Sequence, residues 1–126
     1  MKYSLMIGRF QPFHDGHEAL VRLVLNEKRD QKTNEKKRVC IAIRSTMQDE
    51  ENPYSIEQRM RMIQDRFSKE IFDRQVVVSV IPDIEEVVWG RGVGYGRREI
   101  KLDKTTEEIS ATKIRDGHDA PKKDKG

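Results

Sequence analysis

The sequence is poor in cysteine, in aromatic residues and in long apolar runs. Cys40 is the single cysteine among 126 residues, so an internal disulfide and a CxxC metal-binding pattern are both excluded. Aromatic side chains make up 6% of the residues, and every apolar run falls short of the roughly 18 residues that a membrane-spanning helix needs. We therefore expect a cytoplasmic protein without disulfides, without a cysteine-bound metal and without a membrane partner.

Charged side chains are abundant. They make up 37% of the chain, and the formal net charge is +3 with a pI near 9.0. This mild basic excess suits anionic small molecules and nucleic acid equally well. The run from 26 to 38 (NEKRDQKTNEKKR) carries most of it, and a solvated helix end followed by a loop is the simpler interpretation. Nucleic-acid binding is the alternative, and we expect it to be weak and not sequence-specific.

Three short apolar runs are spaced along the chain, at residues 3–7 (YSLMI), 38–43 (RVCIAI) and 76–81 (VVVSVI). Continuous rather than alternating hydrophobicity is typical of strands that are covered on both faces of a parallel sheet. Two helical patterns lie between the strands. Their apolar faces repeat every three to four residues: His17, Leu20, Val21 and Val24, then Ile56, Met60, Ile63 and Phe67. Ser55 and Gln58 form a capping box that predicts the start of the second helix.

The order strand, helix, strand, helix, strand predicts right-handed crossovers and an α/β fold. We expect a single domain over residues 1–116, with a Rossmann-like, doubly wound parallel sheet of about five strands and flanking helices. Residues 87–89 and 99–102 would supply the shorter strands, and a last short helix would begin near Ser110. Residues 117–126 have the composition of a flexible tail.

The stretch GRFQPFHDGH, residues 8–17, follows the first strand directly. Ligands of open parallel sheets bind beyond the carboxyl ends of the strands, and Gly8 allows the backbone a tight turn there. His14 and His17, with Gly16 between them, lie where the first helix should begin. Helix N-terminal amides attract anions, and each imidazole can donate a hydrogen bond to a phosphate oxygen. The stretch therefore predicts a phosphate-binding site.

These residues resemble a known family. His14-Asp15-Gly16-His17 is similar to the HxGH motif of the nucleotidylyltransferase superfamily, and GRFQPFHxGH looks most like archaeal-type nicotinamide mononucleotide adenylyltransferases. Residues 51–59 (ENPYSIEQR) resemble that group's ENPF(T/S)xxER, and residues 109–115 (ISATKIR) resemble the superfamily's IS(S/G/T)TxIR. The resemblance runs from about residue 3 to 116. The short length and the segment from Tyr54 to Arg59 are also similar to glycerol-3-phosphate cytidylyltransferase.

The resemblance implies attack by an acceptor phosphate on the α-phosphorus of a nucleoside triphosphate, with release of pyrophosphate. It implies catalytic roles for His14, His17 and Arg115. Contacts to the triphosphate would come from Gly8, Arg9, Phe10, Gly16, Ser110 and Thr112. Arg59, and more weakly Arg44 and Trp89, are the candidates for acceptor binding. A magnesium ion would bridge the phosphates without a dedicated set of protein ligands.

The chain departs from the archaeal-type pattern at residues 88–96 (VWGRGVGYG). The glycines there fall at alternate positions, so the dinucleotide fingerprint GxGxxG is absent. A mobile loop or lid and a tight connection are both compatible with this composition, and Trp89 suits base stacking as well as packing against the sheet. Because of this departure, the sequence does not decide between ATP and CTP as the donor. It also does not decide between nicotinamide mononucleotide and a phosphorylated alcohol as the acceptor. A non-catalytic nucleotide-binding regulator and a homo-oligomer are further options.

Overall fold

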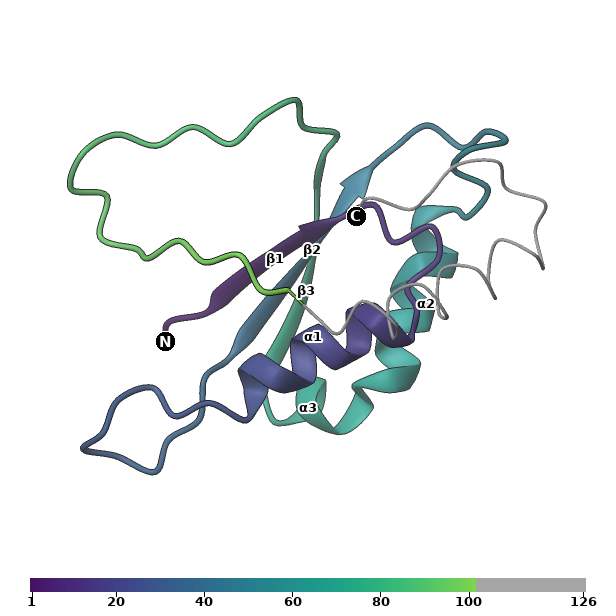
Figure 1. Cartoon of the computed structure of the whole chain (residues 1–126). Helices are drawn as coiled ribbons and strands as arrows, with labels where there is room; N and C mark the ends of the chain where they lie inside the picture. Colours follow the sequence, from purple (N-terminus) through teal and green to yellow (C-terminus); the bar gives the residue numbers. More distant parts are fainter. Residues whose placement is uncertain (102–126) are drawn as a thin grey trace.

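The computed structural model describes residues 1–101, so the motif at 109–115, the helix expected near Ser110 and the tail lie outside the described residues. The elements follow the predicted order, with one short helix added (Figure 1). Their bounds are β1 Ser4–Gly8, α1 Asp15–Leu25, β2 Val39–Ser45, α2 Ile56–Arg66, α3 Ser68–Phe72 and β3 Val76–Pro82.

Within residues 1–101 the sheet has three parallel strands in the order β1-β2-β3. Ser4 pairs with Val39, and Val39 pairs with Val76, so the three strands begin in register. The short strand predicted at 87–89 is absent, and of the strand predicted at 99–102 the described residues 99–101 are not extended in a sheet. Residues 87–89 are only three residues long and run directly into the glycines, which disfavour extended pairing.

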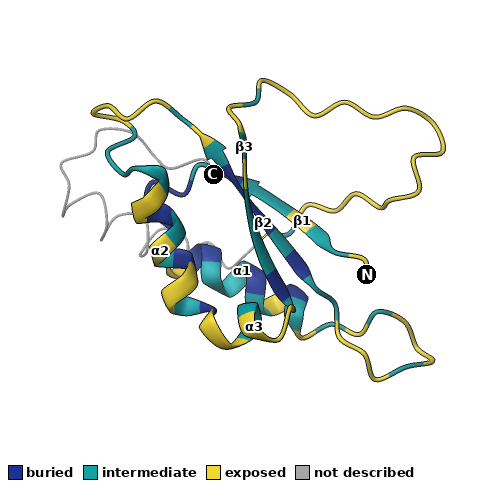
Figure 2. Ribbon diagram, turned by 180° about the vertical axis from the view of Figure 1, so that it is seen from behind, coloured by how far each residue is buried: buried dark blue, intermediate teal, exposed yellow. Residues whose placement is uncertain are grey.

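All three helices lie on the same side of the sheet, as Figures 1 and 2 show from opposite directions. Ile41 and Ile43 of the central strand point into this covered face and are fully buried. Leu5 of β1 points to the other face and is 62% exposed, as the alternation of side chains along a strand requires. Within residues 1–101 the helices therefore cover one face of the sheet only. The doubly wound arrangement that we expected, with helices on both faces, is absent from this part of the chain.

The core lies between this covered face and the helices. Val21 and Val24 of α1, Ile63 of α2 and Phe67 are buried, which confirms the apolar periodicity of both helices. Each fully buried side chain of this size contributes about 1.5–3 kcal/mol. The capping box is also confirmed: Gln58 N–H donates to Ser55 Oγ at 3.1 Å, and Ser55 N–H donates to Gln58 Oε1 at 2.8 Å.

The segment 83–101 leaves the end of β3 and extends on the side of the sheet away from the helices (Figures 1 and 2). It returns at Arg98, whose guanidinium donates two hydrogen bonds to the Glu27 carboxylate at 2.8 and 2.9 Å. Ile100 then packs against the core. No helix in residues 1–101 is long and apolar enough to cross a membrane.

Candidate functional site

The candidate site lies at the carboxyl ends of β1 and β2, where the loop 9–14 leads into α1. Phe10 has a left-handed backbone with φ of 54°, and its ring is fully buried. The Phe10 ring meets Phe13 at 5.2 Å and the edge of His17 at 5.0 Å between centroids. The loop after β1 is therefore anchored by its own aromatic side chains, which fix the point where the helix begins.

His14 and His17 together form the N-terminal cap of α1. His14 Nδ1 accepts from the Gly16 backbone N–H at 3.1 Å, and the His14 backbone N–H donates to His17 Nδ1 at 3.2 Å. The two rings stack with centroids 3.8 Å apart and 22° between their planes. A neutral imidazole that accepts at Nδ1 carries its proton on Nε2. The cap therefore sets the same tautomer in both rings.

Gly16 is explained by the His14 ring. A Cβ at position 16 would lie 2.9 Å from His14 Cε1 and 3.1 Å from His14 Nδ1. The resemblance implied that Gly16 contacts the triphosphate. The structure adds a second reason for glycine, because the imidazole occupies the space that a side chain would take.

Gln11 connects this loop to the segment that resembles ENPF(T/S)xxER, and sequence reasoning assigned it no role. Its Oε1 accepts from Tyr54 N–H at 2.8 Å, and its Nε2 donates to Tyr54 O at 3.0 Å. Nε2 also donates to Thr46 Oγ1 at 3.2 Å. The side chain is 8% exposed and bonds the Tyr54 backbone as a neighbouring strand would. A lone glutamine in a loop gives no periodic signal from which this contact could be predicted.

Arg59 is fully buried and joins the loop after β1 to the end of β2. Its Nη1 donates to Arg9 O at 2.7 Å and to Arg44 O at 2.8 Å, and its Nε donates to Ser55 O at 3.2 Å. Burial lowers the pKa of this guanidinium, and its partners in residues 1–101 are neutral carbonyls. The acceptor contact expected for Arg59 stays a prediction, because its contacts in the described residues are with the backbone carbonyls of Arg9, Arg44 and Ser55.

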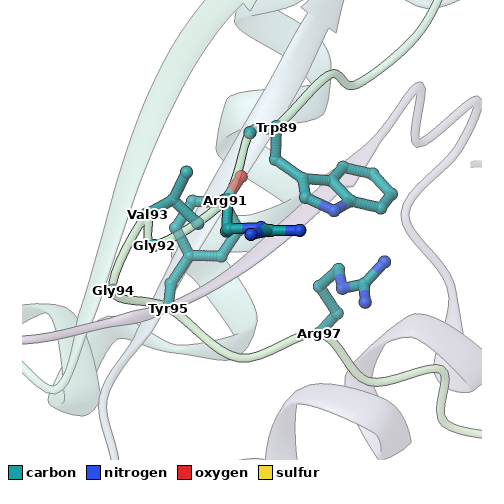
Figure 3. A pocket seen from close by; sticks show the side chains of 8 residues that line it. Trp89, Arg91, Gly92, Val93, Gly94, Tyr95 and Arg97 are labelled. Atoms are coloured by element: carbon teal, nitrogen blue, oxygen red, sulfur yellow. The ribbon is translucent and has the colours of Figure 1, made fainter.

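The other two candidates for acceptor binding lie elsewhere. Arg44 donates to Asp83 Oδ1 at 2.7 and 3.0 Å and to Ile84 O at 3.0 Å, so it anchors the chain after β3. Trp89 lines a hollow formed by residues 89–97 (Figure 3), none of which comes from the histidine loop. The structure therefore gathers His14, His17, Arg9 and Phe10, but does not bring Trp89 to them.

Three predicted site residues, Ser110, Thr112 and Arg115, lie outside the described residues. The triphosphate contacts expected for Ser110 and Thr112 and the catalytic role expected for Arg115 stay predictions.

A protein-built metal cage is absent from residues 1–101, where no group of three or more His, Cys, Asp and Glu side chains could hold an ion. Asp15 at the start of α1 forms an ion pair with Arg66 at 2.9 Å. The magnesium ion expected from the resemblance stays a prediction.

Comparison with known proteins agrees with the geometry of the loop. Residues 5–75 match the family described as Cytidylyltransferase-like. The chain belongs to this family. Members are generally nucleotidyltransferases, and the matched region contains the histidine cap, Gln11 and Arg59.

One curated relative is the nicotinamide/nicotinic acid mononucleotide adenylyltransferase of Acinetobacter baylyi, which is 33% identical over 89 residues. The alignment covers 69% of this chain but 43% of the relative, so the chain matches less than half of that protein's length. No solved structure shows a significant match.

Proposed function

We propose that this protein transfers a nucleotidyl group from a nucleoside triphosphate to a small phosphorylated acceptor. AMP transfer from ATP to nicotinamide mononucleotide is the first candidate reaction. The observation that carries the proposal is the histidine cap, in which both imidazoles accept at Nδ1 and so carry their protons on Nε2 at the start of α1. Two such donors beside helix N-terminal amides suit a polyphosphate.

In the proposed reaction an acceptor phosphate oxygen attacks the α-phosphorus. The new O–P bond forms as the bond from the α-phosphorus to the bridging oxygen breaks, and pyrophosphate leaves with that bonding pair. No nucleophile from the protein is needed, so the protein contributes alignment and stabilisation of charge. His17 would donate from Nε2 to an oxygen of the reacting phosphate, and His14 to a neighbouring phosphate oxygen.

The remaining contacts rest on the resemblance. Backbone amides at Arg9 and Phe10 would bind phosphate oxygens, and Ser110 and Thr112 would bind the β- and γ-phosphates. Arg115 would neutralise the leaving pyrophosphate. Bound magnesium would supply further charge neutralisation on the phosphates.

Cytidylyl transfer from CTP to a phosphorylated alcohol is the second candidate. The family match favours it by description, whereas the curated relative favours adenylyl transfer. The family match ends at residue 75 and does not cover the segment from residue 83 onward.

The test is pyrophosphate release by the purified protein with magnesium, with ATP or CTP, and with a panel of phosphorylated acceptors. We expect release with one donor and acceptor pair and its loss in His17→Ala. His118→Ala, which removes the third histidine of the sequence, is the matched control and should retain activity. Tight nucleotide binding without pyrophosphate release in the presence of any acceptor would overturn the proposal in favour of a regulator.

A further inference from the structure

Residues 89–97, which we call the glycine loop, have a composition unlike the rest of the surface. They line a hollow with a volume of about 520 Å³. Its lining consists of Trp89, Arg91, Val93, Tyr95 and Arg97 with three of the four alternate glycines (Figure 3). Gly92 and Gly94 have φ of 72° and 81°, which favour glycine at both positions. The alternation therefore presents every large side chain of the loop to one hollow.

The glycine loop combines exposed aromatic rings with positive charge. Trp89 is 48% exposed and Tyr95 is 56% exposed. The guanidinium of Arg97 lies 4.4 Å from the centroid of the Trp89 ring. Residues 89–97 contain no acidic side chain, and neither Arg91 nor Arg97 forms an ion pair with any residue among 1–101. Arg98, one residue further, is by contrast paired with Glu27.

Packing within the protein does not account for these side chains. A Cβ added at Gly90, Gly92, Gly94 or Gly96 would meet no atom within 4 Å, so the loop backbone is not pressed against the body of the protein. An aromatic ring that served the core would be buried like Phe10 or Phe67. Arg97 covers one face of the Trp89 ring, and the exposed parts of the rings and guanidinium groups remain available to a ligand that offers planar rings and negative charge.

We propose that the glycine loop binds single-stranded nucleic acid without sequence specificity. Bases would stack on the rings of Trp89 and Tyr95, and Arg91 and Arg97 would contact the backbone phosphates. Single strands fit because the bases of a duplex are already stacked on each other. A mononucleotide fits less well, because small-ligand sites enclose most of the ligand, whereas Trp89, Val93 and Tyr95 are each about half exposed.

This inference is independent of the proposed transfer reaction and gives Trp89 a ligand other than the acceptor expected from the resemblance. The basic run 26–38 is linked to the residue that follows the loop, because Glu27 of that run is the partner of Arg98. Contacts with ring faces and phosphates do not involve the edges of the bases, which differ between sequences. We therefore expect no discrimination between nucleic-acid sequences.

Trp89 is the single tryptophan of the chain, so its fluorescence reports this site directly. We expect an oligothymidylate of about ten nucleotides, a length within the usual site size, to quench it. Anisotropy of a labelled oligonucleotide then measures binding in the variants. Trp89→Ala should weaken binding about fivefold to a hundredfold, and Trp89→Phe should restore most of it.

The double variant Arg91→Ala/Arg97→Ala should reduce the slope of log affinity against log salt by about 1.4, because two phosphate contacts are lost. The matched control is Arg61→Ala/Lys69→Ala, which removes two exposed positive charges from the helix side and should bind as the wild type does. Equal binding by wild type and Arg91→Ala/Arg97→Ala would overturn the proposal. So would quenching by thymidine monophosphate or nicotinamide mononucleotide at lower concentrations than the oligonucleotide. Neither result bears on pyrophosphate release, which tests the transfer reaction separately.

Discussion

His14 and His17 stack with ring centroids 3.8 Å apart, and the His14 backbone N–H donates to His17 Nδ1 at 3.2 Å. The residue at the third helical position of a capping box is usually Glu or Gln, and here it is a histidine. One bond therefore has two effects: it completes the cap of α1, and it leaves the proton of His17 on Nε2. These two effects can be separated by substitution.

His17→Gln should preserve the fold and lose activity. Glutamine at this position can still accept from the His14 N–H, but it brings no imidazole Nε2–H to the site. We expect turnover to fall about a hundredfold to a thousandfold, as for loss of one transition-state donor, with little change in melting temperature. His17→Ala should also lower the unfolding free energy by about 0.5–2 kcal/mol. Near-normal turnover in His17→Gln would remove His17 from the mechanism.

Gly16→Ala should displace the His14 ring, because the new Cβ would lie 2.9 Å from His14 Cε1. Alanine favours helix over glycine by about 1 kcal/mol, which offsets part of the clash, so the melting temperature should change little. Misplacing a site residue by about 1 Å can cost up to about a hundredfold in rate. Steady-state kinetics and thermal unfolding check both expectations. Unchanged kcat/KM would show that the position of His14 does not matter.

Gln11→Glu should make activity depend on pH in a new way. An ionised carboxylate keeps the bond from Tyr54 N–H but loses the donor to Tyr54 O, so the two loops should separate and kcat should fall. Protonation restores that donor, and burial beside a carbonyl favours the protonated form. The ratio of variant to wild-type kcat should therefore rise as the pH is lowered. Gln11→Ala, which has no group to titrate, should show a constant ratio, and a constant ratio in Gln11→Glu would contradict the positioning role.

Arg59→Met should destabilise the protein, because it leaves the carbonyls of Arg9 and Arg44 without their buried donor. An unsatisfied buried group costs about 1–3 kcal/mol, which urea unfolding would detect. Arg61→Met, at an exposed position on the same helix, should stay within about 0.5 kcal/mol of the wild type. Wild-type stability in Arg59→Met together with a raised KM for the acceptor would instead support the acceptor contact expected from the resemblance.

The ion pair between Glu27 and Arg98 should give a pH-dependent contribution to stability. The hydrogen bonds from Arg98, and secondarily from Lys37, lower the pKa of Glu27. A lowered folded-state pKa stabilises the fold at pH values above the ordinary pKa of a glutamate, and the contribution is lost as the pH falls through the lowered value. Urea midpoints of wild type and Glu27→Gln should thus differ near neutral pH and converge in acid. A difference that persists in acid would assign the effect to packing.

Local patterns in the sequence predicted most of the secondary structure and the position of the two histidines at the start of the first helix. The capping box at Ser55, the apolar repeat that ends at Phe67 and the histidines after the first strand each depend on residues within one or two turns of chain. Local hydrogen bonds and periodic burial determine such features, so a short window of sequence suffices. The same reasoning failed at 87–89, where three apolar residues did not form a strand.

The tertiary structure alone decided what holds the site in place. Gln11 bonds Tyr54 across 43 residues of chain, and Arg59 reaches the carbonyl of Arg9 across 50. Tertiary structure also placed the three helices on one face of the sheet in residues 1–101. A buried polar side chain takes whichever backbone groups the packed elements bring to it. That choice depends on how distant segments cross, and it has no local pattern from which it can be read.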